Sequence, residues 1–167
     1  MLEKINSPDD IKKLSQSQVT ELCREIRETI LESVSESGGH LASNLGMVEA
    51  TVALHRVFDA PRDSIVFDVG HQCYTHKLLT GRYPQFSTIR QKGGISGFTN
   101  RSESEYDVLT AGHSGSALPT ALGIARANVL KRKRGYAVAV IGDGSFTNGM
   151  VYETLNSCAD KGLKLII

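Results

Sequence analysis

The sequence predicts an α/β fold in which a parallel sheet carries helices on both faces. Three short apolar runs rich in β-branched residues, at 64–68, 136–141 and 163–167, predict buried strands. Segments with apolar residues at helical spacing separate these runs, so each strand leads through a helix into the next. Strands connected in this way lie parallel and are joined by right-handed crossovers.

The segments before the first strand predict helices. Ser7, Pro8 and the two acids that follow have the order of a helix start, because Ser caps, Pro suits the first turn and acids favour the positive end of the helix dipole. Residues 17–36 then place apolar side chains three and four positions apart, and Gly38-Gly39 ends the pattern. A further helix is expected at about 46–58. Its predicted apolar side consists of Met47, Ala50, Thr51, Leu54 and Phe58.

The rest of the chain alternates helices, strands and loops. A helical turn is expected at about 74–79, and an irregular loop over 81–107. Helical spacing returns over 114–133 with small residues that would allow close approach to a sheet: Gly115, Ala117, Ala121, Gly123 and Ala125. A Gly-Asp-Gly turn at 142–144 and a helix at 147–160 follow the second strand. We expect two parts, an N-terminal helical arm (1–37) and an α/β domain (38–167).

Composition and charge exclude several classes of protein. Nineteen Lys and Arg against eighteen Asp and Glu give a net charge of +1, which offers no general attraction to nucleic acid or to an anionic membrane. The basic run 131–134 is interpreted as a solvated helix end. Three widely spaced cysteines predict neither a disulfide framework nor a zinc site. With neither a secretory leader nor a membrane-spanning apolar run, the expectation is a cytoplasmic protein.

Two polar turns, 68–71 and 142–145, follow predicted strands, and ligands of open α/β sheets bind beyond the carboxyl ends of the strands. Asp143 lies between two glycines, which allow a phosphate to approach closely. Because a carboxylate repels a phosphate, a divalent cation between them would resolve the conflict, and Mg²⁺ takes one or two carboxylates plus phosphate oxygens. The alternative is a tight turn in which Asp143 caps the next helix.

Three of the five histidines, His40, His71 and His113, directly follow a glycine at the junction of two predicted elements. Glycine permits close approach of a ligand to the backbone, and imidazole suits phosphate contacts and proton transfer near pH 7. The alternative for each of them is a capping or packing role. His55 and His76 lie within predicted helices and are interpreted as structural or surface residues.

Taken together, these segments resemble the 1-deoxy-D-xylulose-5-phosphate synthase family, which belongs to the thiamine-diphosphate enzymes related to transketolase. The ordered motifs cover nearly the whole chain: Gly39-His-Leu-Ala-Ser-Asn-Leu-Gly46, Phe67-Asp-Val-Gly-His-Gln72, His76-Lys-Leu-Leu-Thr-Gly-Arg82, Ile89-Arg-Gln-Lys-Gly-Gly94, Arg101-Ser-Glu-Ser-Glu-Tyr-Asp107, Gly112-His-Ser114 and Gly142-Asp-Gly144. The resemblance implies a diphosphate-binding domain. It also implies condensation of pyruvate with D-glyceraldehyde 3-phosphate, with loss of CO2, in isoprenoid and thiamine biosynthesis.

The resemblance also assigns roles to individual residues. Asp143 matches the family's Mg²⁺ ligand, and His40 matches a histidine implicated in proton handling near the reacting carbons. The matches to thiamine diphosphate contacts are His71, Gly112, His113, Ser114, Gly144 and Ser145. In the family, a second metal-binding segment and a pyrimidine-binding domain lie beyond residue 167. We therefore expect no turnover by this polypeptide alone. The resemblance also implies a homodimer when the protein is complete.

Two alternatives remain open at this point. The residues after Ser114 and Gly144 depart from the family pattern, which is compatible with a transketolase-like enzyme that uses another sugar acceptor. The chain also ends within an apolar strand, and an unpaired strand invites pairing with another chain. That feature is compatible with a non-catalytic, partner-binding subunit.

Overall fold

The computed structural model describes residues 1–159 and 162–167, and the chain divides into two compact units. Unit 1 consists of Met1–Asp59 and His71–Gly97, and unit 2 consists of Ala60–Gly70 and Phe98–Ile167. The chain therefore passes from unit 1 to unit 2, back to unit 1, and again to unit 2.

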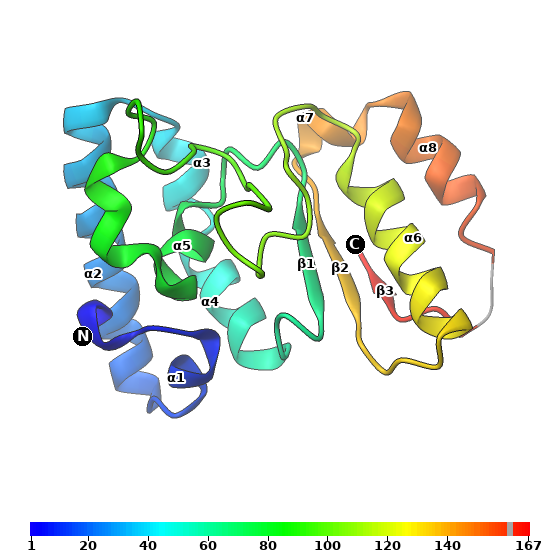
Figure 1. Ribbon diagram of the computed structural model, residues 1–167, viewed down its shortest axis with the longest axis horizontal. Coiled ribbons are helices and arrows are strands. Elements are labelled where there is room, and N and C mark those ends of the chain that lie inside the picture. Colours follow the sequence, from blue (N-terminus) through cyan, green and yellow to red (C-terminus); the bar gives the residue numbers. More distant parts are fainter. Residues whose placement is uncertain (160–161) are drawn as a thin grey trace. The chain divides into compact units, whose positions relative to one another are not determined.

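Unit 1 is helical (Figure 1). Its α-helices are α1 (Pro8–Lys12), α2 (Gln16–Ser37), α3 (Leu41–Leu45), α4 (Val48–Val57) and α5 (Tyr74–Lys77). Helical segments of the 3-10 or π type occur at Leu2–Lys4, Leu78–Arg82 and Tyr83–Thr88. Helix α2 packs against α3 and α4, so residues 1–37 share a compact unit with the helices that follow them. The expected boundary between residues 37 and 38 does not coincide with a boundary of either unit. The division into an N-terminal arm and an α/β domain stays a prediction.

The buried face of α4 differs from the one that the sequence predicts. The buried residues are Val48, Thr51, Val52 and His55, whereas Ala50 of the predicted side is exposed. His55 is fully buried, and its Nε2 lies 2.9 Å from Nδ1 of His76 in α5, with the two rings stacked. A polar residue thus occupies the centre of this helix interface, which an apolar pattern does not reveal.

Burial lowers the pKa of His55 well below its usual value, and the nearby His76, Lys12 and Arg82 act in the same direction. The unfolded chain takes up a proton near pH 6.5 that the folded chain excludes, so the free energy of unfolding should fall as the pH drops from about 6.5. His55→Gln retains a nitrogen near the Nε2 position but does not titrate. We expect it to flatten the dependence of unfolding free energy on pH between about pH 7 and 5.

Urea unfolding at a series of pH values checks this expectation. The interval lies above the range in which carboxyl groups titrate, below about pH 4.5. Ile26→Val provides the control, because it shortens a buried side chain without altering a titratable group and should leave the slope unchanged. An equal slope in His55→Gln and the parent protein would contradict the expectation.

Unit 2 contains the sheet, and its strands confirm the predicted parallel α/β fold. They are β1 (Ser64–Phe67), β2 (Ala137–Val140) and β3 (Leu165–Ile166), paired in the order β1-β2-β3, all parallel, with helices around the sheet. The helices of the unit are α6 (Ala117–Leu130), α7 (Asp143–Phe146) and α8 (Gly149–Asn156). The last residue of the helix predicted over 147–160, residue 160, lies outside the described residues.

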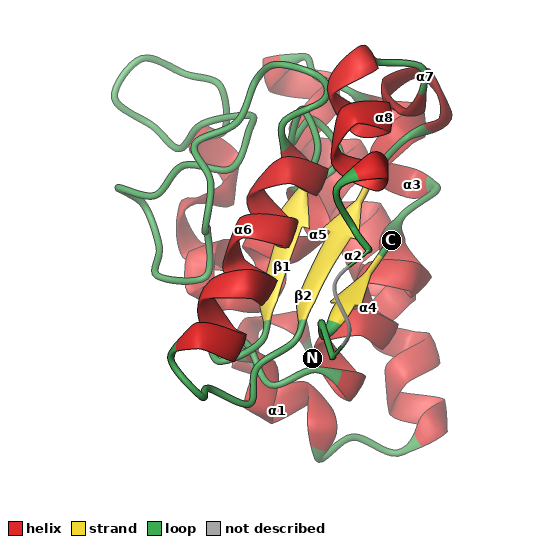
Figure 2. Ribbon diagram, turned by 90° about the vertical axis from the view of Figure 1, so that its right-hand side faces the viewer, coloured by secondary structure: helices red, strands yellow, loops and turns green. Residues whose placement is uncertain are grey.

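Helix α6 runs along the three strands, as Figure 2 shows. Ala117, Ala121 and Ala125 recur every four residues and are buried in a core with Val66 and Ala139 of the strands. The small side chains therefore allow the expected close packing. Gly123 does not belong to this face, because a Cβ placed there would meet no atom within 4 Å. Its inclusion in the predicted contact surface was wrong.

Other expectations from composition have structural counterparts. The basic run 131–134 is exposed directly after α6 ends, as the solvated-helix-end interpretation predicts. None of the three cysteines is joined in a disulfide, and Cys23 and Cys73 are buried whereas Cys158 is half-buried. Within the two described stretches of the chain, no helix has both the length and the apolar character needed to cross a bilayer.

Candidate active site

The carboxyl ends of β1 and β2 lie at the same edge of the sheet. Phe67 is in register with Val140, and the N–H of Asp68 donates to the carbonyl of Val140 at 2.9 Å. The polar segments that follow the two strands therefore begin side by side. This is the position at which parallel sheets commonly bind ligands.

Asp143 is exposed at the end of β2. The predicted Gly-Asp-Gly turn is the start of the one-turn helix α7, and its N-cap is Gly142, not Asp143. One carboxylate oxygen, Oδ1, accepts the N–H of Gly144 at 2.9 Å. An added Cβ at Gly142 or Gly144 would meet no atom within 4 Å, so open space adjoins the carboxylate. Gly142 thus holds the N-cap position, while the Asp143 carboxylate binds an N–H of the first turn, as the capping alternative expects.

The predicted segment Gly112, His113 and Ser114 is exposed and lies next to the residues after α7. Asn148 makes the connection, because its Nδ2 donates to the carbonyl and hydroxyl oxygens of Ser114 at 3.3 and 3.4 Å. Its Oδ1 accepts the N–H of Met150 and so caps α8. Unit 2 thereby brings the 112–114 segment together with the segment that carries Asp143, Gly144 and Ser145.

Gly115 permits this close approach. Its φ is +83°, and a Cβ added to it would lie 2.6 Å from Cγ of Asn148. Any other residue would have to displace the asparagine that links the two segments. Asn148 is one of the residues after Gly144 that depart from the family pattern, and its role in joining these segments was not predicted.

Asp68 is buried within unit 2 and does not face solvent. The residue is 1% exposed, and its carboxylate accepts two backbone N–H groups, those of Gly115 at 2.9 Å and Ala117 at 2.7 Å. These residues stand at the start of α6, directly after the 112–114 segment. Asp68 was expected to belong to a polar turn that faces a ligand, but it supports that segment from within. The two bonds span more than forty residues of sequence, so local patterns gave no sign of them.

His40 and His71 meet in unit 1. Their ring centroids are 5.2 Å apart in an edge-to-face arrangement, with His40 exposed and His71 half-buried. Asn44 lies behind them, and its Nδ2 donates to the carbonyl oxygens of both His40 and His71. The predicted site residues thus form two groups: His40 and His71 in unit 1, and the other six in unit 2.

The backbone before His40 lies tightly against a tyrosine. Gly39 has φ +147°, and a Cβ added to it would lie 2.7 Å from the hydroxyl oxygen of Tyr74. Tyr74 is fully buried, and burial raises the pKa of its hydroxyl. A glycine is therefore required sterically before His40, whatever the role of the imidazole.

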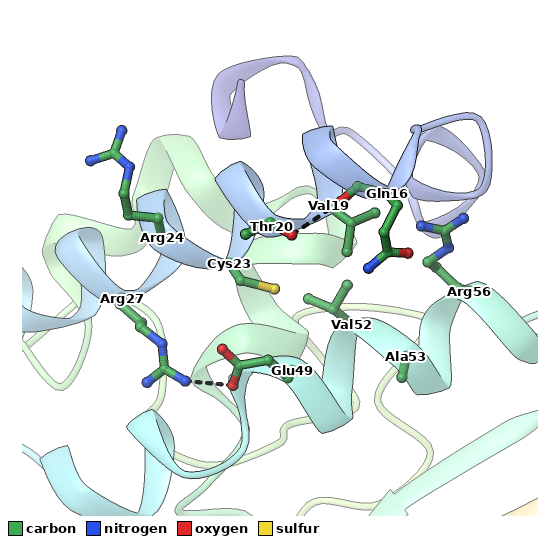
Figure 3. A pocket seen from close by; sticks show the side chains of 10 residues that line it. All are labelled: Gln16, Val19, Thr20, Cys23, Arg24, Arg27, Glu49, Val52, Ala53 and Arg56. Atoms are coloured by element: carbon green, nitrogen blue, oxygen red, sulfur yellow. Dashed lines mark hydrogen bonds and ion pairs between the residues drawn. The ribbon is translucent and has the colours of Figure 1, made fainter.

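A cavity of about 640 Å³ in unit 1 contains none of the predicted site residues. It lies between α2 and α4 (Figure 3), with Val19, Cys23 and Val52 directed into it and the Arg27–Glu49 ion pair at its edge. Its lining is mainly apolar and carries no imidazole. This cavity is separate from the residues that the sequence motifs identify.

The residues of unit 2 fit a magnesium ion bound together with a diphosphate. Among residues 1–159 and 162–167, no group of three His, Cys, Asp or Glu side chains is placed to hold a metal ion, so Asp143 would contribute a single ligand. Mg²⁺ keeps several waters and is commonly bound by one or two carboxylates plus substrate phosphates. An exposed carboxylate beside open space meets that requirement.

Comparison with known proteins gives a consistent result. Residues 2–167 match the protein family described as 1-deoxy-D-xylulose-5-phosphate synthase. Curated relatives with that name include proteins from Dictyoglomus turgidum (55% identical over the whole chain), Caldanaerobacter subterraneus (56% over 94% of it) and Syntrophomonas wolfei (53% over the whole chain). The chain spans 27%, 25% and 26% of these relatives, about a quarter of their length.

Proposed function

Because this chain belongs to the 1-deoxy-D-xylulose-5-phosphate synthase family, we propose that its protein condenses pyruvate with D-glyceraldehyde 3-phosphate. The reaction releases CO2 and forms 1-deoxy-D-xylulose 5-phosphate, with thiamine diphosphate and Mg²⁺ as cofactors. The main supporting observation is that Asn148 joins the Ser114 segment to the segment of exposed Asp143 beside the ends of two parallel strands. Both segments carry motifs of the family.

Residues of unit 2 would hold the cofactor. Asp143 supplies a carboxylate oxygen to Mg²⁺, and the cation neutralises a diphosphate that the carboxylate alone would repel. The proposed contacts to thiamine diphosphate are Gly112, His113, Ser114, Gly144 and Ser145. The resemblance of residues 67–72 to the family motif makes His71 a further proposed contact. When bound, thiamine diphosphate supplies the nucleophilic carbon that attacks a 2-oxo acid, and the protein positions it.

His40 is the proposed acid–base residue. Its imidazole is exposed and therefore reachable by a substrate, and imidazole exchanges protons readily near neutral pH. A ring nitrogen of His40 would give or take a proton at the carbons that react. The edge-on contact with His71 would hold the imidazole of the proposed catalytic residue next to that of a proposed cofactor contact.

The proposal extends to the assembly of the protein. A pyrimidine-binding domain completes the active site, from the same natural chain or from a separate subunit, and the complete protein is a homodimer in the cytoplasm. Its product would enter isoprenoid and thiamine biosynthesis. The 167-residue polypeptide alone, which spans about a quarter of its relatives, would not turn over.

A steady-state assay of the full-length protein tests this function. With pyruvate, D-glyceraldehyde 3-phosphate, thiamine diphosphate and Mg²⁺, we expect CO2 and 1-deoxy-D-xylulose 5-phosphate in equal amounts. We expect neither product when one of the two substrates is omitted. Substitution of other aldose phosphates separates the proposal from a transketolase-like enzyme. That alternative rests on the residues after Ser114 and Gly144 that depart from the family pattern, among them Asn148, which contacts Ser114. Absence of turnover with every acceptor would overturn both and favour a non-catalytic subunit.

A further inference from the structure

We propose that Asn44 is a positioning residue that holds the backbone of His40 and of His71 so that the two imidazole rings stay in contact. This inference rests on the proposed function for the roles of the two histidines, but its geometry is independent of it. Asn44 is fully buried in α3. Its Nδ2 donates to the carbonyl oxygen of His40 at 2.6 Å and to that of His71 at 2.8 Å.

The remaining polar atom of the amide is also used. Oδ1 of Asn44 accepts the N–H of Tyr74 at 2.9 Å. An asparagine side chain offers two donor hydrogens and an acceptor oxygen on one planar group. Here both donors and the acceptor bind backbone groups of two chain segments. One segment contains His40, 4 residues before Asn44, and the other contains His71 and Tyr74, 27 and 30 residues after it. No other side chain of this size has that combination.

These bonds hold the chain on both sides of the histidine contact. Tyr74, whose N–H binds Asn44, also places its hydroxyl against Gly39, the residue before His40. Asn44 and Tyr74 thus fix the backbone from which each imidazole projects, and the rings meet edge-on as a result. Small displacements of reacting groups strongly lower rates, so support of this kind bears on catalysis as well as on stability.

Asn44→Asp separates the positioning role from simple packing. The carboxylate has nearly the same shape and retains an acceptor for the N–H of Tyr74, but it cannot donate to the two carbonyl oxygens. In the full-length protein we expect a fall in kcat at saturating cofactor and a rise in the Kd for thiamine diphosphate, each by about tenfold or more. A joint change is expected because one side chain supports both histidines.

A second readout does not depend on activity. In the cofactor-free protein, we expect the rates at which diethylpyrocarbonate modifies His40 and His71, measured by mass spectrometry, to change several-fold together in Asn44→Asp. The rate at His113, which lies in unit 2, should stay unchanged. Asn44→Ser, which can donate to only one carbonyl, provides a smaller perturbation if the aspartate variant fails to fold.

Ile26→Val is the matched control, because Ile26 is fully buried in α2 and takes no part in these hydrogen bonds. It should lower stability without altering modification rates, Kd or kcat. Unchanged modification at both histidines in the folded Asn44 variants, or equal changes in Ile26→Val, would overturn the inference. A wild-type protein that neither binds thiamine diphosphate nor turns over would refute the proposed function instead, and the modification rates would still decide the role of Asn44.

Discussion

Asp143→Asn is expected to weaken binding of thiamine diphosphate to the full-length protein by about 100-fold at fixed Mg²⁺, or ~2.7 kcal/mol. The proposed Mg²⁺ ligand loses its charge, and a neutral amide is a poorer ligand for a hard divalent cation than a carboxylate. Turnover at a limiting cofactor concentration should fall in parallel. Calorimetric titration with thiamine diphosphate, repeated over a range of Mg²⁺ concentrations, measures the effect.

The same substitution should leave the fold intact. Asp143 is exposed, and the oxygen of an asparagine can accept the N–H of Gly144 as Oδ1 does. We therefore expect the free energy of unfolding to change by about 0.5 kcal/mol or less. Glu153→Gln removes an exposed charge from the neighbouring α8 and should change neither property. Unaltered Mg²⁺ dependence in Asp143→Asn would refute the metal role of Asp143.

The sheet of this protein could be predicted from sequence because burial on both faces makes a strand an unbroken apolar run. β1 and β2 lie inside the runs at 64–68 and 136–141, and their parallel pairing follows from the helices between them. The three-and-four spacing of α2 is equally visible, since its polar side faces solvent. These features depend on local periodicity alone.

Elements whose interfaces contain polar or glycine residues could not be predicted in the same way. The face of α4 was predicted wrongly because His55, a buried residue paired with His76, counts as polar in any apolar pattern. Gly123 was assigned to the contact face of α6 because of its size, although it points into open space. The turn at 142–144 is the start of a helix, a distinction that glycines on either side of Asp143 obscure.

The candidate site likewise contains residues that a local sequence pattern reveals and residues that it does not. The residues that would touch a cofactor are recognisable by type and by their neighbouring glycines. The residues that hold them, Asn44, Asp68 and Asn148, act through hydrogen bonds to backbone atoms 27 to 49 positions away. Such partners depend on the three-dimensional fold and leave no periodic signal in the chain.

Asp68→Asn is expected to reduce the free energy of unfolding of unit 2 by about 2–3 kcal/mol. One amide oxygen can replace one carboxylate oxygen, but the amide NH2 then faces the second backbone donor, either Gly115 N–H or Ala117 N–H. A buried donor without an acceptor carries its full desolvation cost. Because these donors directly follow the 112–114 segment, faster hydrogen exchange in peptides spanning 112–118 and weaker thiamine diphosphate binding should accompany the loss of stability.

Asp63→Asn distinguishes support of the site from general stability. Asp63 is also a buried carboxylate that accepts a backbone N–H, from Tyr136 at 2.7 Å, but it precedes β1 whereas Asp68 follows it. Both variants should be less stable, because each alters a charged, buried acceptor. Only Asp68→Asn should alter cofactor affinity and exchange in 112–118. Equal losses of affinity in the two variants would mean that the binding segment responds to the stability of the sheet as a whole, and Asp68 would then have no specific part in holding it.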